Sequence, residues 1–87
     1  GSVSKVEALR VGAKIEDMDI FDIYEMLTHT EKNDLINAYE NLAKGSRNHL
    51  RAFVGQLEVF GEIYEAQYLD PDEVDDIVNS PRETGRY

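Results

Sequence analysis

The sequence predicts an all-α domain, made of a long antiparallel helical hairpin followed by a short C-terminal helix. Three observations predict it. Apolar residues recur at steps of three and four in two long segments, a polar turn signal separates these segments near His29, and both prolines come after residue 70. The length of 87 residues suffices for one small domain. We divide the chain into residues 1–2, 3–61, 62–80 and 81–87.

Residues 1–2, Gly1 and Ser2, are typical of the scar that remains after an affinity tag is cleaved. We therefore expect the chain to be an excised piece of a longer protein, and the helical pattern is counted from Val3.

Residues 3–61 are expected to form the hairpin. The first helix carries one stripe with steps of three and four: Val6, Leu9, Ala13, Glu16, Ile20, Ile23 and Leu27. Thr28 to Glu31 then has the form of a capping box for the second helix, with Thr28 or Thr30 as the cap. The second stripe has the same spacing: Leu35, Tyr39, Leu42, Ser46, His49, Phe53, Gln56 and Phe60. Gly45 and Gly55 indicate that another helix approaches closely, and Gly61 is expected to cap the C-terminal end.

Residues 62–80 are expected to form a connector and a short acidic helix. Residues 62–68 show no helical stripe, and their two tyrosines are expected to cover the end of the hairpin. Asp70 as N-cap and Pro71 at the first helical position start the short helix, which ends before Pro81. The polar residues 81–87 are expected to be a frayed tail.

A two-helix hairpin cannot hide both of its apolar stripes by self-contact alone. We expect half of a four-helix bundle, which either homodimerisation or a missing N-terminal half of the parent chain would complete.

Charge and composition narrow the function classes. Eighteen acidic and nine basic residues give a net charge of -9, which repels phosphate backbones and anionic lipids, so we expect no nucleic-acid partner. Because no apolar run approaches the roughly 20 residues of a membrane span, we expect no membrane partner and a cytoplasmic location. The chain has no cysteine, so carboxylates and imidazoles are its candidate metal ligands.

Glu16 and His49 stand where the stripes call for apolar side chains. They are equally far from a turn centred near residues 31–33, so they should face each other across the hairpin. Carboxylate and imidazole groups from facing helices are the ligands of buried metal centres in bundles. Asp19, one turn from Glu16, is the candidate auxiliary ligand. The alternatives are a Glu–His hydrogen bond without metal, or an exposed pair. Arg47 and Arg51 are expected to pair with Asp17, Asp22 or Glu58, or with a partner chain.

The run from Tyr39 to Phe53, YENLAKGSRNHLRAF, is preceded by VGAKIEDMDI at residues 11–20 and followed by Gln67-Tyr68-Leu69. This pattern resembles the C-terminal half of an uncharacterised prokaryotic family of ferritin-like (rubrerythrin-like) domains, domain of unknown function 2202. The resemblance implies a four-helix bundle in which each hairpin supplies a carboxylate from one helix and a Glu-x-x-His from the other to a di-iron centre. Glu16 matches the lone carboxylate and His49 the histidine, but Ser46 stands where the motif's glutamate belongs.

Because Ser46 replaces the motif's glutamate, each hairpin supplies one carboxylate ligand fewer than the family motif implies. Two copies would bring two Glu and two His, a set that suits one divalent ion, Fe, Zn or Mn, better than two. The resemblance implies iron-dependent oxidase or peroxide chemistry in the full-length parent. The alternative is a catalytically inert, homodimerising helical interaction module. The sequence assigns no catalytic residue and leaves open whether the chain is an enzyme.

Overall fold

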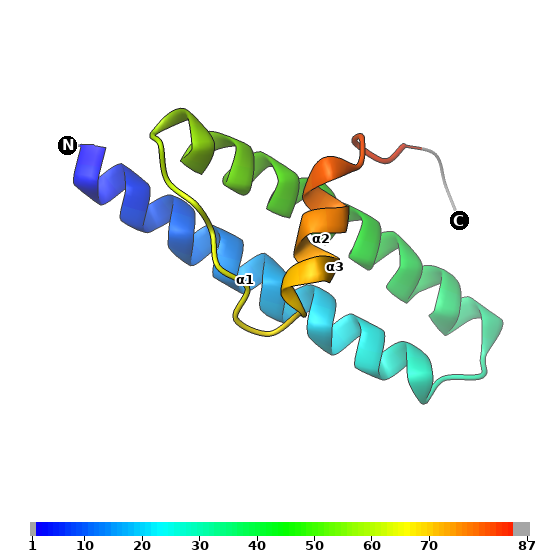
Figure 1. The fold of residues 1–87 in the computed structure, drawn as a ribbon. Helices are drawn as coiled ribbons and strands as arrows, with labels where there is room; N and C mark the ends of the chain where they lie inside the picture. Colours follow the sequence, from blue (N-terminus) through cyan, green and yellow to red (C-terminus); the bar gives the residue numbers. More distant parts are fainter. Residues whose placement is uncertain (1, 85–87) are drawn as a thin grey trace.

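The computed structural model describes residues 2–84, which form three α-helices and no strand. Helices α1 (Ser2–Thr28) and α2 (Asn33–Val59) pack as a long antiparallel hairpin, and the short α3 (Pro71–Asn79) lies across it (Figure 1). The predicted all-helical class, with two long packed helices and one short one, is confirmed. Since α1 already includes Ser2, the pair set aside as a tag scar is not wholly outside the helix.

Residues 29–32 connect α1 to α2. The hydroxyls of Thr28 and Thr30 each donate a hydrogen bond of 2.7 Å to a backbone carbonyl three or four residues earlier. Carbonyls in the last turn of a helix lack intrahelical donors, so these hydroxyls close the end of α1. The predicted capping box is therefore wrong: α2 begins at Asn33, with Lys32 as an N-cap that makes no side-chain cap bond.

The end of α2 is closed at Gly61, as predicted. The Gly61 N–H donates to the carbonyl of Glu58 and the Glu62 N–H to that of Leu57, both at 2.9 Å, which is the Schellman pattern. Gly61 has a φ of +73°, in the left-handed region that glycine adopts without a Cβ penalty. This turn sends the connector back along α1 (Figure 1).

The start of α3 has the predicted residues, with Asp70 at the N-cap position and Pro71 in the first turn, but the Asp70 side chain makes no capping hydrogen bond. Val74 and Ile77 are buried on the face that α3 turns toward the hairpin. The short helix and the connector thereby form a third layer over one side of α1 and α2.

The core lies beneath this third layer. Its buried members come from all three helices and the connector: Ala13, Ile20, Leu50, Val54, Leu57, Leu69, Val74 and Ile77. On α1 the predicted stripe agrees with the structure at Ala13 and Ile20. On α2 the prediction is wrong by one residue, because Leu50, Val54 and Leu57 are buried whereas His49 and Gln56 are exposed. One residue corresponds to a rotation of about 100° around the helix.

We call the opposite side of the hairpin the open face, defined by Gly12 and Glu16 on α1 and by Leu35, Leu42, His49 and Phe53 on α2. On α1, the residues that contact the connector lie on the other side of the helix, at positions 10 and 17. Leu35 and Leu42 are 44% and 58% exposed. The residues predicted to form the inner stripe of α2 therefore lie largely on a face that the described part of the chain leaves uncovered.

The two long helices approach each other closely at Gly12. A Cβ at this position would lie 2.7 Å from ring carbons of Phe53, so the ring packs directly on the glycine backbone. By contrast, a Cβ at Gly45 or Gly55 would meet no atom of residues 2–84 within 4 Å beyond its chain neighbours and the adjacent backbone of its own helix. The close approach predicted at these two glycines is thus not made within the described chain.

None of the helices in residues 2–84 is long and apolar enough to cross a membrane.

Candidate functional site

Glu16 and His49 meet on the open face, as their equal distance from the turn predicted. His49 Nδ1 lies 3.3 Å from Glu16 Oε2. The Glu16 side chain is only 15% exposed, because it lies between the two helices, whereas the His49 side chain is 67% exposed. The pair therefore presents one recessed carboxylate and one accessible imidazole to whatever covers this face.

The spacing of these two atoms fits a shared metal ion. Zn–N and Zn–O bonds of roughly 2.1 Å at a tetrahedral angle place the two ligand atoms about 3.4 Å apart. The observed 3.3 Å needs no rearrangement of either helix to reach that separation. The same distance also suits an ion pair or a hydrogen bond, the alternative interpretation of this pair.

The other predicted ligand is not part of this group. Across residues 2–84 no cluster of three or more His, Cys, Asp or Glu side chains lies close enough to hold a metal ion, so the structure does not bring Asp19 to Glu16 and His49. Asp19 and Ser46 are both half-buried. A single chain thus offers two ligands, and further ligands would have to come from elsewhere.

Sequence reasoning missed Asp17, which is the one fully buried charged residue among residues 4–84. Its Oδ2 accepts hydrogen bonds from the Tyr64 hydroxyl at 2.5 Å and from the backbone N–H groups of Gln67 at 2.7 Å and Tyr68 at 3.3 Å. Its Oδ1 accepts the N–H of Leu69 at 2.8 Å. A signal existed in the sequence: Asp17 lies four residues after Ala13 and three before Ile20, which is the spacing of the stripe itself.

These hydrogen bonds explain the course of the connector. Residues 62–68 form no helix, so their N–H groups need acceptors, and a buried carboxylate that accepts several of them is itself satisfied. Burial, together with the hydrogen bond to Asp17, raises the pKa of the Tyr64 hydroxyl above its ordinary value. Asp17 is therefore a structural anchor, and the expected pairing of Asp17 with Arg47 or Arg51 is wrong.

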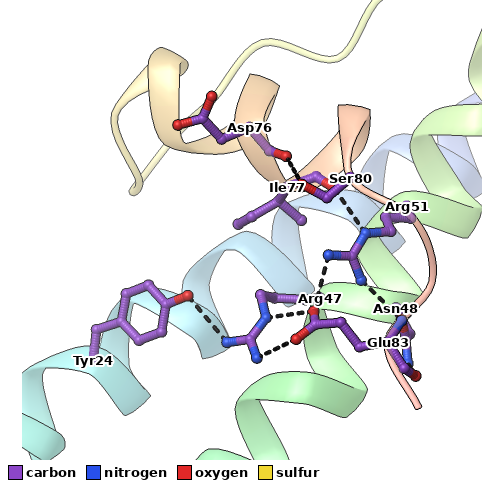
Figure 2. Close-up of polar contacts among 8 residues, drawn as sticks. All are labelled: Tyr24, Arg47, Asn48, Arg51, Asp76, Ile77, Ser80 and Glu83. Atoms are coloured by element: carbon purple, nitrogen blue, oxygen red, sulfur yellow. Dashed lines mark hydrogen bonds and ion pairs between the residues drawn. The ribbon is translucent and has the colours of Figure 1, made fainter.

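Arg47 and Arg51 instead bind Glu83, beyond the end of α3 (Figure 2). Arg47 donates from Nε and Nη2 to the two carboxylate oxygens at 2.7 Å each, and Arg51 Nη2 donates at 2.9 Å. Hydrogen bonds from Arg47, and secondarily from Arg51, lower the pKa of Glu83 from 4.5 to about 2. The same contact raises the pKa of Arg47 further above its ordinary value.

This contact lies within the segment that the sequence predicts to fray. Glu83 is half-buried and held by side chains of α2, whereas residues 85–87 lie outside the described residues. No pattern in the sequence links a lone glutamate after Pro81 to two arginines more than 30 residues earlier.

Comparison with known proteins places the chain in a family. The chain is 47% identical over 85 residues to the uncharacterized protein MJ0754 of Methanocaldococcus jannaschii, an alignment that covers 98% of this chain and 46% of that protein. The crystal structure of the hypothetical protein MJ0754 matches with a TM-score of 0.87 over 90% of this chain and 45% of that chain. This chain thus spans about half the length of the relative it matches. The model of an uncharacterized protein domain, DUF2202, matches residues 1–81, and the chain belongs to this family.

Proposed function

We propose that this chain is one half of a ferritin-like, metal-binding helical domain in which Glu16 and His49 hold a divalent metal ion together with ligands from a second helical hairpin. The observation that carries the proposal is the separation of 3.3 Å between His49 Nδ1 and Glu16 Oε2 on the open face. A separation of this size between two ligand atoms, one from each long helix, supports a shared ion because it is close to the spacing of two ligands on one tetrahedral metal.

The second hairpin is needed for both packing and coordination. Leu35 and Leu42 are large exposed apolar side chains on the same face as the pair, and covering them removes apolar surface from water. A second copy related by a two-fold axis would cover them and bring a second Glu16 and a second His49 to the axis. The result is a four-ligand set of two carboxylates and two imidazoles. The remaining part of a longer parent chain would serve the same purpose.

The ligand set favours a single ion. In a homodimer each hairpin contributes one carboxylate to the centre, because Ser46 occupies the position from which a second one would come. A di-iron centre relies on bridging carboxylates from four helices. Two Glu and two His instead suit one Zn, Mn or Fe ion.

The chain's own groups have defined roles in this centre. The recessed Glu16 carboxylate neutralises positive charge, and the accessible His49 imidazole faces the second hairpin. When bound there, iron would supply oxygen or peroxide redox chemistry to the parent protein, whereas zinc would make the centre structural.

Metal binding is tested on protein purified without chelator. We expect elemental analysis to find a divalent metal, and added Fe(II), Zn(II) or Mn(II) to raise the melting temperature. Ion at 100 times its dissociation constant stabilises by about 2.7 kcal/mol. Glu16→Ala and His49→Ala should each abolish this shift. His29→Ala is the matched control, since His29 is exposed in the loop between α1 and α2. A chain that binds none of the three ions contradicts the proposal.

The second candidate is a homodimerising interaction module without metal. The exposure of Leu35 and Leu42 favours it independently of the pair. It predicts a dimer by light scattering that Leu42→Glu dissociates, while Glu16→Ala and His49→Ala leave the dimer intact and no metal is bound.

A further inference from the structure

Asn48 hydrogen-bonds to the backbone of Glu83, while Arg47 and Arg51 bind the Glu83 carboxylate. The Asn48 amide donates to the Glu83 carbonyl at 3.0 Å and accepts from the Glu83 N–H at 2.9 Å. In an extended chain the N–H and C=O of one residue point to the same side, as they do toward a neighbouring β-strand. The three side chains on α2 therefore recognise one glutamate in an extended segment, through both its backbone and its carboxylate (Figure 2).

The recognising side chains are also held by contacts that do not involve Glu83. Arg51 Nε donates to the carbonyl of Ile77 at 2.7 Å, and Arg51 Nη1 donates to Asn48 Oδ1 at 2.8 Å. Arg47 Nη1 donates to the Tyr24 hydroxyl oxygen at 3.1 Å. Because these contacts would remain if Glu83 left, the site is preorganised for its ligand, which lowers the entropic cost of binding.

The segment that fills the site has few other attachments. We call residues 80–84 the strap. Apart from Glu83, each of its residues is exposed, and no strap residue belongs to the buried core. Segments with few buried apolar contacts open at low free energy without global unfolding. The strap can therefore leave α2 while the hairpin and α3 stay folded.

We propose that Arg47, Asn48 and Arg51 form a recognition site for an extended peptide segment that carries a glutamate, and that the strap is its releasable occupant within the chain. The site lies on the α3 side of the hairpin, opposite the open face, so it is independent of the metal site proposed above. Bidentate arginine contacts select a carboxylate over an amide of the same shape.

Because the strap already fills the site, an added peptide binds only at concentrations high enough to displace it. A segment tethered by a short link acts at an effective concentration in the millimolar range. A peptide added to the wild-type chain must compete with this, whereas a chain that lacks the Glu83 carboxylate keeps its strap in the site only through the two backbone hydrogen bonds to Asn48. Removing that one carboxylate should therefore expose binding of a peptide from outside.

The test uses the full chain with Glu83→Ala and a synthetic peptide of residues 80–84, Ser-Pro-Arg-Glu-Thr, acetylated and amidated to remove terminal charges. NMR resonances of the Arg47 and Arg51 Nε–H groups and of the Asn48 side-chain amide report binding, with peptide titrated to about 5 mM. We expect saturable shifts in the variant. The wild-type chain should bind the peptide at least about tenfold more weakly, because the strap competes.

The matched control is the same peptide with glutamine in place of its glutamate. It should bind the Glu83→Ala chain at least about tenfold more weakly, because it offers no charge for the arginine hydrogen bonds. If Glu83→Ala lowers the helix content in circular dichroism, Glu83→Gln takes its place. Equal binding of both peptides, or no shift of these resonances over the whole titration, would overturn the proposal and leave the strap a fixed structural clip.

Discussion

Replacing Asp17 by alanine tests the account of how the connector is held. This substitution removes the acceptor for the Tyr64 hydroxyl and for the backbone N–H groups of Gln67, Tyr68 and Leu69. A hydrogen bond to a charged group contributes about 1.5–3 kcal/mol. We count only the two shortest backbone bonds, from Gln67 at 2.7 Å and from Leu69 at 2.8 Å, as lost. The expected cost is about 3–6 kcal/mol.

That loss is a large part of the free energy of unfolding of the chain. At roughly 0.05–0.15 kcal/mol per residue, a chain of this length has a free energy of unfolding of about 4–13 kcal/mol. For a domain of this size, 1 kcal/mol corresponds to about 4–8 °C in melting temperature, so Asp17→Ala should melt at least about 12 °C below the wild type. The assay is thermal and urea unfolding followed by circular dichroism.

Two variants sharpen the result. Asp17→Asn keeps one acceptor oxygen for the Tyr64 side of the cluster but sets an N–H₂ group against the Leu69 N–H, so it should cost only about 1–3 kcal/mol. It should also lower the raised pKa of Tyr64 toward its ordinary value, as measured by ultraviolet titration. Asp22→Ala, at an exposed position of the same helix, should stay within about 0.5 kcal/mol. An Asp17→Ala chain within about 1 kcal/mol of wild type would show that Asp17 does not hold the connector.

Two further predictions concern glycine packing and acid. Gly12→Ala should destabilise the fold by about 1–2 kcal/mol, because its new methyl group overlaps the Phe53 ring. Gly55→Ala, whose methyl group has open space, should stabilise the fold by up to about 1 kcal/mol. Equal shifts of the melting temperature in the two variants would contradict this. The Glu83 pKa is lowered, so its contribution to stability is present above pH 4.5 and is lost as the pH falls toward 2. The exchange protection factor of the backbone N–H of residue 83, which donates to Asn48, should therefore fall across that interval in wild type but not in Glu83→Gln. Identical protection factors in the two chains would show that the contact with Arg47 does not hold the strap.

The prediction for α2 shows that apolar periodicity identifies a helix but does not identify its buried face. The steps of three and four residues correctly identified a helix, but α2 carries apolar side chains on two faces, Leu42 and Phe53 on one and Leu50 and Leu57 on the other. A pattern along one helix does not say which face is covered. The third layer, made of the connector and α3, decided this by covering the second face.

The capping threonines show a similar limit. A hydroxyl followed three residues later by a carboxylate suits the start of a helix, yet the hydroxyls of Thr28 and Thr30 also suit the unsatisfied carbonyls at the end of the preceding one. Both arrangements satisfy backbone groups. Only the path of the turn selects between them.

The helices, the turn near residues 29–32, the closure at Gly61 and the meeting of Glu16 with His49 could be predicted from the sequence, because each depends on local chemistry or on equal counts of residues from one turn. The burial of Asp17 beneath the connector and the position of Glu83 between Arg47 and Arg51 follow only from the three-dimensional path of the chain. These contacts join residues more than 30 positions apart through a segment without regular periodicity. Their partners are chosen by how the chain folds back on itself.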